Sequence, residues 1–249
     1  MRILDALIDS LPKYDGKVQE VRCCAFWTAV TTRYTGLATT YRALEGEMDT
    51  HQTGVKDVGF LTEKKALDLV EFARSENTLE ASIGMATINS LVDLDEGRCV
   101  DLNAYDVLVE KGRNRNIGVV GHFPFVPKLK EVAKNLWVIE KRVRPGDLPE
   151  SEARRLLPQC DVVCLTGTSF INHTIDDLLS LCAQSFVVLT GPTSPLTPLL
   201  FDHGIDVVCG TRVVDREQVL RYISQAATFR QLHGHGVRLL ALAKEGGRE

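Results

Sequence analysis

The sequence lacks the features that mark membrane-spanning, secreted or nucleic-acid-binding proteins. No uncharged apolar run reaches the roughly eighteen residues that a membrane-spanning helix needs. The first ten residues include Asp5 and Asp9, where a signal peptide would be apolar. Lys and Arg number 29 against 33 Asp and Glu, and the net charge of −4 offers no field to attract phosphate backbones or anionic lipids. We therefore expect a cytoplasmic protein with no nucleic-acid partner and no membrane partner.

The seven cysteines show no regular spacing, and no pair of them forms a zinc-binding signature. Cys160 and Cys164 lie four residues apart in an apolar run, which in a strand separates them by about 13 Å. Cys23 and Cys24, if they lie in a strand, point to opposite faces. We expect reduced cysteines that behave as small apolar residues rather than a disulfide framework.

Three common catalytic or cofactor motifs are also missing. The chain has no Gly-x-Ser-x-Gly elbow and no Walker phosphate loop. Gly118 and Gly121 are not followed by a third glycine, and Pro124 and Pro127 remove backbone N–H groups from the turn that would hold a pyrophosphate. Triad hydrolysis, ordinary phosphoryl transfer and conventional NAD binding at this turn are therefore disfavoured.

What the chain does contain is the composition of a folded protein, with 249 residues, 44% hydrophobic and 25% charged. The first half predicts an α+β unit: an amphipathic opening helix from Ile3, then two or three antiparallel strands in residues 17–43 with turns near Arg33 and Gly36. Two helices follow, over Thr62–Arg74 with a capping box and over about 79–94 with many small residues suited to close packing.

The second half has a different pattern. Five short apolar runs alternate with helix-compatible segments, which predicts a doubly wound parallel sheet of about five strands; the runs are 117–120, 136–139, 162–165, 186–189 and 205–208. The polar stretch 110–116 is the best candidate linker between the halves. We therefore predict an α/β fold with domains over 1–112 and 113–249.

Ligands of open parallel sheets bind beyond the carboxyl ends of the strands. Four of the five loops at this predicted edge carry glycine together with hydroxyl, imidazole or guanidinium groups, which indicates a site for a polar ligand. The four loops are 121–125, 166–172, 190–195 and 210–212. For Asn172, and for Ser194 or Thr197, each taken singly, capping of the following helix is the simpler interpretation.

One carboxylate and several histidines are further candidates for the site. Glu140 lies at the end of the second predicted strand, where a ribose-binding carboxylate is found in dinucleotide folds, or it is a solvated charge beside Lys141. His122 is the best-placed nitrogen ligand for a metal. His233 and His235 form a His-x-His pair that is more often solvated than chelating, and their participation, like that of His173, stays open.

Several segments resemble a protein family of unknown function for which a role in heavy-metal chelation has been suggested. They are Ile117-Gly-Val-Val-Gly-His-Phe-Pro124, the run from Thr166 to Asp176, the run from Leu189 to Leu199, Gly204 to Thr211, and, in the first half, Gly36-Leu-Ala38 and Ser82 to Asn89. The resemblance implies an enolase N-terminal-like domain followed by a Rossmann-like domain, with the site where the two meet. Carried over to the matching positions, the resemblance implies a set of candidate ligand-binding residues: His122, Pro124, Thr168, Asn172, Gly191, Thr193, Ser194 and Thr211. It also implies that Asn89 faces this cleft. His173 departs from the small residue expected between Asn172 and Thr174.

Two functions of different classes follow. The first is binding or chelation of a transition or heavy metal, or of a metal-bearing small molecule, in the cleft between the domains. Because the loops offer mainly oxygen and soft metals need nitrogen or thiolate, we expect the metal to arrive with its own organic ligand. The alternative is an enzyme acting on a nucleotide-like or phosphorylated small molecule. The sequence leaves open turnover, the metal, and whether the chain forms a homo-oligomer or serves as a purely structural subunit.

Overall fold

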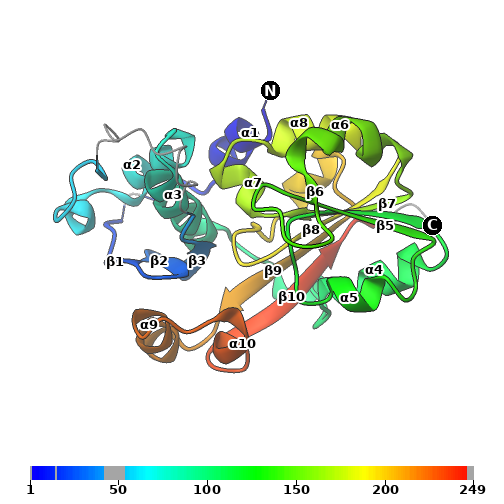
Figure 1. The fold of residues 1–249 in the computed structure, drawn as a ribbon. Coiled ribbons are helices and arrows are strands. Elements are labelled where there is room, and N and C mark those ends of the chain that lie inside the picture. Colours follow the sequence, from blue (N-terminus) through cyan, green and yellow to red (C-terminus); the bar gives the residue numbers. More distant parts are fainter. Residues whose placement is uncertain (1, 15, 42–53, 246–249) are drawn as a thin grey trace.

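The structure, a computed structural model, describes residues 2–14, 16–41 and 54–245. Within these ranges the strands form one sheet of three strands and one of seven. The three-stranded sheet and its helices lie to one side of the larger sheet, and helices cover both faces of the larger sheet (Figure 1). The predicted α/β class is confirmed.

The N-terminal sheet is antiparallel, and its central strand is buried on both faces. After helix α1 (Ile3–Asp9), its strands follow in the order β1-β2-β3; they are β1 (Glu20–Cys23), β2 (Trp27–Thr31) and β3 (Thr35–Thr39). Side chains alternate across a strand, so Trp27 and Ala29 pack against the C-terminal helices while Val30 packs on the opposite face. This explains why all five residues of β2 are buried.

Close helix packing in this half uses the small residues that the sequence predicted. Helix α3 (Thr78–Leu91) lies against β2 and β3 on one side and against η2 (Glu71–Arg74) on the other. A Cβ at Gly84 would come within 2.0 Å of the Ala73 nitrogen, and one at Gly36 within 2.1 Å of the Ala86 oxygen. Gly36 therefore belongs to β3 and permits its contact with α3, which corrects the predicted turn there.

The predicted helix Thr62–Arg74 is also corrected. It divides into η1 (Leu61–Glu63), α2 (Ala66–Val70) and η2. The break has a tertiary cause, because Lys64 and Lys65 are extended: Val18 donates its N–H to the Lys64 carbonyl at 3.2 Å, and Ala66 donates to the Gly16 carbonyl at 3.0 Å. Pairing with the chain before β1 thus overrides the local helix preference.

The seven-stranded sheet has the order β10-β9-β8-β7-β4-β5-β6. Its strands are β4 (Asn116–Val120), β5 (Asn135–Glu140), β6 (Leu148–Pro149), β7 (Val162–Thr166), β8 (Phe186–Thr190), β9 (Val207–Val213) and β10 (Val237–Ala243). All neighbours pair in parallel except β9 and β10. The five predicted strands are present, and the sequence analysis missed the edge strands β6 and β10.

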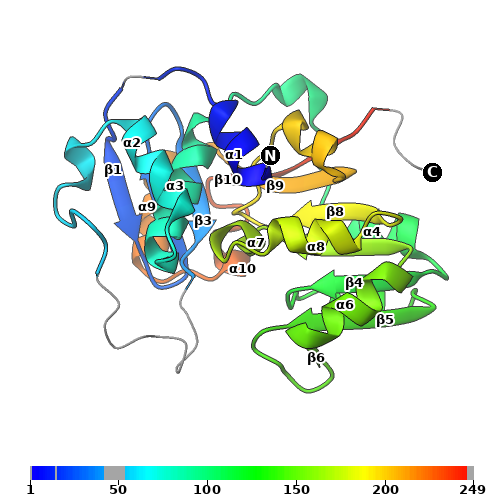
Figure 2. The ribbon, with the colours of Figure 1, turned by 90° about the horizontal axis from the view of Figure 1, so that it is seen from above.

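Helices cover the two faces of this sheet. One face packs against α6 (Ala153–Leu156), η5 (Leu157–Gln159), α7 (Thr168–Ile171) and α8 (Ile175–Leu181). Figure 2 shows α6 and α8 over this face. The other face packs against α4 (Ala104–Gly112) and α5 (Val126–Leu129). The remaining elements are η3 (Glu96–Arg98), η4 (Glu150–Glu152), η6 (Pro198–His203), α9 (Arg216–Ser224) and α10 (Phe229–Leu232).

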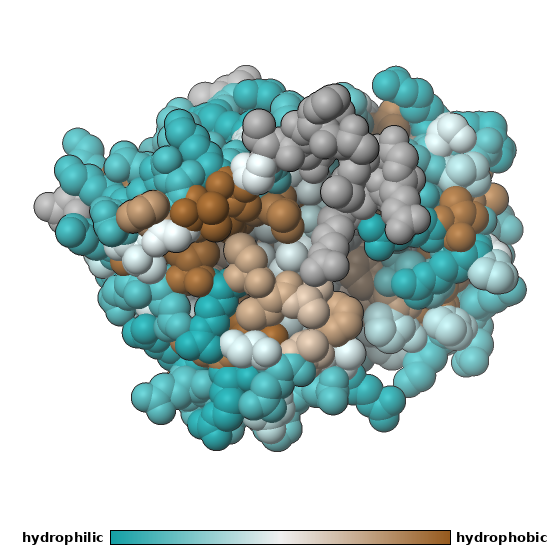
Figure 3. All heavy atoms as spheres, turned by 60° about the vertical axis from the view of Figure 1, so that its left-hand side comes forward, coloured by the Kyte–Doolittle hydropathy of each residue, from teal (hydrophilic) through white to brown (hydrophobic). Residues whose placement is uncertain are grey.

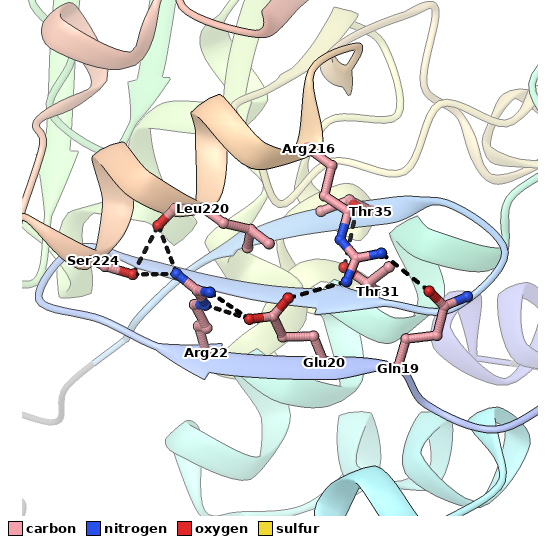
Figure 4. Close-up of polar contacts among 8 residues, drawn as sticks. All are labelled: Gln19, Glu20, Arg22, Thr31, Thr35, Arg216, Leu220 and Ser224. Carbon is pink, nitrogen blue, oxygen red and sulfur yellow. Dashed lines mark hydrogen bonds and ion pairs between the residues drawn. The ribbon is translucent and has the colours of Figure 1, made fainter.

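The two halves are extensively joined. Helices α9 and α10 leave the large sheet and pack beneath β1 to β3 (Figure 1). Arg22 of β1 donates to the Leu220 carbonyl and the Ser224 hydroxyl, and Arg216 of α9 contacts Gln19 and Glu20 (Figure 4). The predicted division after residue 112 stays a prediction, and α4, which precedes it, packs on the large sheet.

The face carrying the N-terminal half is mostly hydrophilic, with brown and tan apolar residues gathered over its central part (Figure 3). Across the described ranges, no helix combines the length and apolar character needed to cross a membrane. The cytoplasmic location remains a prediction.

Candidate functional site

The carboxyl ends of the parallel strands meet at one edge of the large sheet, as the sequence analysis predicted. Strand β4 lies at the centre, with β5 and β6 on one side and β7 to β9 on the other. This is the doubly wound order in which the connections reverse direction between β4 and β7. The loops after β4 and β7 therefore diverge at this position, and two cavities open beside them.

Two adjoining cavities form a cleft at this edge. We call the first, of about 290 Å³, the polar compartment; His122, Glu140, Lys141, Arg142, Glu150 and Asn172 are among its lining residues. We call the second, of about 510 Å³, the aromatic compartment; Trp27, Tyr105, Phe125, Lys128 and Phe229 are among its lining residues. The compartments share the lining residues Thr39, Phe123, Thr166 and Thr168. Because Trp27 and Thr39 belong to the N-terminal sheet, both halves of the chain build the cleft.

His122 lies in the polar compartment and is held by an acidic partner. Its Nδ1 lies 3.0 and 3.1 Å from the two carboxylate oxygens of Asp147, whose side chain is 3% exposed. The Arg144 N–H also donates to the Asp147 carboxylate, at 3.1 Å. Because a carboxylate on Nδ1 favours a proton there, it leaves Nε2 as the ring nitrogen with a lone pair. Nε2 has no hydrogen-bond partner in the described part of the chain.

Asp147 was missed by the sequence analysis. Pro145 and Gly146 signal a turn, and Gly146 does adopt a positive φ of 95° within it. That local signal places Asp147 at the end of a turn but says nothing of the contact with His122, which lies 25 residues earlier. The contact exists because β4 and β5 are parallel neighbours and their following loops emerge at the same edge.

Glu140 lies at the end of β5 and lines the polar compartment, as expected of either of its two interpretations. Its Oε1 accepts the backbone N–H groups of Lys141 at 2.8 Å and of Arg142 at 3.3 Å. This arrangement holds the carboxylate at the strand end.

Thr168 and Asn172 are both brought into the polar compartment. The hydroxyls of Thr166 and Thr168 lie 3.0 Å apart at the boundary with the aromatic compartment. The Asn172 Oδ1 accepts from the Thr174 hydroxyl at 2.7 Å and from the Thr174 N–H at 3.3 Å, just before α8 begins. Asn172 thus has a local structural role at the entry to α8, and its Nδ2 remains available for a ligand.

Pro124, Gly191, Thr193 and Thr211 line the aromatic compartment. Thr193 is 1% exposed, and its Oγ1 accepts the N–H of Thr39 at 3.0 Å. It therefore also fixes the N-terminal sheet to the loop after β8. The four residues His122, Asn172, Thr193 and Thr211 consequently divide between two neighbouring compartments instead of lining one pocket.

Two of the predicted residues line neither compartment. Ser194 is buried behind Gly167, whose Cβ would lie 2.5 Å from the Ser194 hydroxyl. Asn89 does not face the cleft cavities; its Nδ2 donates to the carbonyls of Leu37 at 2.8 Å and of Pro192 and Thr193 at 3.2 Å each. The side chain thus joins β3, α3 and the loop after β8.

His173 and His235 have structural contacts. His173 has a φ of +56°, a region that favours Gly or Asn, which explains why a small residue is expected there. Its Nε2 lies 2.9 Å from the Ser75 carbonyl and so joins the two halves. His235 stacks on Tyr222 with ring centroids 4.7 Å apart. Among the residues that the structure describes, no group of three or more His, Cys, Asp and Glu is placed to hold a metal ion.

Every cysteine of the chain is free, as predicted. Burial raises the pKa of Cys160, Cys182 and Cys209 to about 12 each, and Cys164, also buried, has a raised pKa as well. These sulfurs are neutral thiols near pH 7, whereas metals and electrophiles react with thiolates.

The fold and cleft define a mixed α/β protein in which a mostly parallel seven-stranded sheet meets a smaller α+β unit at a two-compartment cleft. The chain belongs to the DUF364 family, whose model, described as "Putative heavy-metal chelation", matches residues 103–241. The DUF4213 model, with the same description, matches residues 4–92. The predicted family resemblance is confirmed.

Individual proteins agree with this assignment. An uncharacterized protein of Methanocaldococcus jannaschii is 27% identical over 173 residues, which are 66% of this chain and 67% of that protein. A DUF364 protein of unknown function from Desulfitobacterium hafniense has a crystal structure that matches with a TM-score of 0.83 and 27% identity, over 97% of this chain and 98% of its own. A Pyrococcus horikoshii member matches with a TM-score of 0.81 and 20% identity, over 98% of this chain and all of its own, and shows the shared fold.

Proposed function

We propose that this protein binds a metal that is already held by a small organic ligand, in the cleft between its two halves. The observation that carries the proposal is the carboxylate-braced His122 in the polar compartment. A carboxylate on one ring nitrogen fixes the orientation and the tautomer of the imidazole, and histidines that bind metals commonly have such a partner. The family description supports the same class of ligand.

The donor chemistry of the cleft favours a metal complex over a bare ion. His122 supplies one nitrogen, and the other polar groups around it are hydroxyls, an amide, the carboxylates Glu140 and Glu150, and the cations Lys141 and Arg142. One imidazole occupies one coordination position of a transition metal, so the organic ligand must fill the others. Lys141 and the hydroxyls line the same compartment and can contact the oxygens of that ligand.

A copper probe tests the proposal. Copper(II) nitrilotriacetate leaves coordination positions that an imidazole fills, and nitrogen coordination is visible in its paramagnetic resonance spectrum. We expect one equivalent to bind to the wild type and His122→Ala to lower the affinity at least tenfold. His235→Ala is the matched control, because His235 lies outside the cleft and stacks on Tyr222. Equal binding by wild type and His122→Ala would refute the proposal, and so would freshly purified protein with no metal and no affinity for chelates.

A specific observation also favours the alternative function, that of an enzyme. The sheet has the strand order of dinucleotide-binding folds, and Glu140 ends the strand that carries the ribose-binding carboxylate in them. An enzyme acting on a nucleotide-like or phosphorylated small molecule would use this carboxylate. Calorimetric titration with adenosine cofactors and sugar phosphates tests it: Glu140→Gln should abolish any heat signal, and a flat response of the wild type across the panel would remove this alternative.

A further inference from the structure

The aromatic compartment has no role in the function proposed above, although it is the larger of the two cavities. From its walls, floor and charge we infer that it binds a flat aromatic group that carries a negative charge. This inference rests on the proposed function only in joining that group to the metal-binding part of one ligand. The compartment itself can be tested without any metal.

Aromatic rings from distant parts of the chain form its walls. Phe123 and Phe125 of the loop after β4 are stacked, with centroids 5.0 Å apart and planes at 3°, and Tyr105 of α4 lies 6.3 Å from Phe125. Trp27 of β2 and Phe229 of α10 contact each other with centroids 5.8 Å apart. Aromatic walls gain stacking and edge-to-face contacts from a flat ring beyond the burial of its area.

The Trp27 ring is held in place before any ligand binds. It is 8% exposed, and its Nε1 donates to the Ala227 carbonyl at 2.8 Å. A wall fixed in this way loses little side-chain entropy when a ligand packs on it.

Glycine residues contribute backbone to the floor of the compartment. Gly167, which directly follows β7, and Gly210, which lies within β9, both line it. A Cβ at Gly167 would lie 2.7 Å from the Ser194 nitrogen, and one at Gly210 would lie 2.8 Å from the Ser194 oxygen. Close approach of the chain to Ser194 therefore requires glycine at both positions, and what remains at the floor is flat peptide backbone that suits a flat ligand.

The charge of the compartment comes from one residue. Lys128 is the single charged side chain among the described residues of the lining, and its Nζ lies 5.7 Å from the centroid of Tyr105. An anionic substituent, such as a carboxylate or phenolate, would balance this charge at the rim. The shared residues Thr39, Phe123, Thr166 and Thr168 connect the compartment to the one that contains His122. A single ligand can therefore place its aromatic anion here and its metal beside His122.

The test uses 2-naphthoate, a flat anion with no chelating group, and cyclohexanecarboxylate, a non-planar apolar anion. The chain has two tryptophans, so the variant Trp137→Phe retains a single indole N–H signal, that of Trp27, in a proton–nitrogen correlation spectrum. We expect 2-naphthoate to shift this signal by its ring current and to bind at least tenfold more tightly than cyclohexanecarboxylate. Phe125→Ala should weaken naphthoate binding at least tenfold.

The contribution of the Lys128 charge is tested with a variant and a matched control. Lys128→Ala should weaken naphthoate binding several-fold and reduce its dependence on salt, whereas Lys130→Ala, an exposed lysine just after the same helix and outside the lining, should leave binding unchanged. Equal affinity for the two anions, or no shift of the Trp27 signal at millimolar naphthoate, would overturn the inference. Because naphthoate needs no metal, this failure leaves the copper experiment with His122→Ala unaffected, and a failure of the copper experiment leaves naphthoate binding unaffected.

Discussion

Asp147 and His122 form a buried-carboxylate and imidazole pair, with both carboxylate oxygens within 3.1 Å of Nδ1. The Asp147 side chain is 3% exposed and that of His122 is 25% exposed, so the pair presents one face of the imidazole to the cleft and hides the carboxylate behind it. An arrangement of this kind fixes both the ring orientation and the tautomer.

We predict that Asp147→Asn weakens binding of copper(II) nitrilotriacetate about tenfold, which is the lower end of the usual effect of removing such a partner. The amide can still contact Nδ1, but it no longer favours the tautomer with a lone pair on Nε2. The affinity is measured by titrating the protein with copper(II) nitrilotriacetate and recording the paramagnetic resonance spectrum. Asp161→Asn is a control at the opposite end of the sheet, where Asp161 accepts the Asn116 N–H at 2.8 Å. An Asp147→Asn variant that binds as tightly as the wild type would show that the carboxylate does not orient a ligand.

The organisation of the large sheet could be predicted from sequence because β4, β7 and β8 are buried on both faces and therefore consist of continuous apolar runs. Strand β10 was not predicted, because Val237–Ala243 does not show the alternation of apolar and polar residues that marks a strand. It forms by antiparallel pairing along the whole of β9. The breaks around α2 likewise depend on pairing with distant backbone. Long-range pairing cannot be read from local preference.

The candidate site shows the same limit. The loops that bear His122 and Thr193, and the start of α7 at Thr168, follow from strand direction alone. Thr211, predicted in the loop after the fifth strand, lies within β9, because antiparallel pairing with β10 extends β9 to Val213. The sequence does not reveal that Asp147 meets His122, or that Trp27 and Phe229 complete an aromatic wall. These contacts depend on where the turn after β5 folds back and on how α10 packs beneath the N-terminal sheet.

We predict that Ser194→Ala does not destabilise the protein and raises its stability by up to about 1 kcal/mol. The Ser194 hydroxyl is buried and has no hydrogen-bond partner in the described part of the chain, so the alanine removes a desolvated polar atom without losing a bond. Ser169→Ala is the matched comparison, because its equally buried hydroxyl donates to the Thr166 carbonyl at 2.6 Å. That variant should lose about 1 kcal/mol. Urea unfolding of both variants measures the difference, and a loss for Ser194→Ala as large as that for Ser169→Ala would contradict the assignment.

We predict that Asn89→Asp destabilises the protein by about 3 kcal/mol. The Asn89 Nδ2 donates to three carbonyl oxygens, those of Leu37, Pro192 and Thr193, and a carboxylate in its place would face these oxygens with no proton to donate. Thermal unfolding measures the loss. Asn103→Ser is a suitable control, because a serine hydroxyl can replace the Oδ1 of Asn103 that caps α4, and only the exposed contact of the Asn103 Nδ2 with Asp106 is lost. Should Asn89→Asp unfold at the wild-type temperature, the side chain would not hold the halves together.

The contact between β1 and α9 predicts a pH dependence of stability. Glu20 accepts from Arg22 at 2.6 Å and from Arg216 at 3.1 Å (Figure 4). Burial of Glu20 acts to raise its pKa, but the hydrogen bonds and charges of Arg22 and Arg216 outweigh it, and the pKa lies below the ordinary value of 4.5. Because the folded pKa is depressed, this carboxylate stabilises the fold above pH 4.5, and its contribution is lost as the pH falls through the folded pKa.

Glu20→Gln should therefore lower the free energy of unfolding by about 1 kcal/mol at pH 7, the scale of a partly exposed ion pair. The difference from the wild type should shrink as the pH falls below 4.5 and vanish once Glu20 is protonated in both states, because a protonated carboxyl and an amide then carry the same charge. Urea unfolding at a series of pH values measures the difference. Glu217 lines the same surface hollow as Glu20, between β1 and α9. Glu217→Gln should differ little from the wild type across this range, since no hydrogen bond or ion pair of the described residues involves the Glu217 carboxylate. A difference between Glu20→Gln and the wild type that persists unchanged at the lowest pH would mean that the charge of Glu20 does not hold β1 to α9.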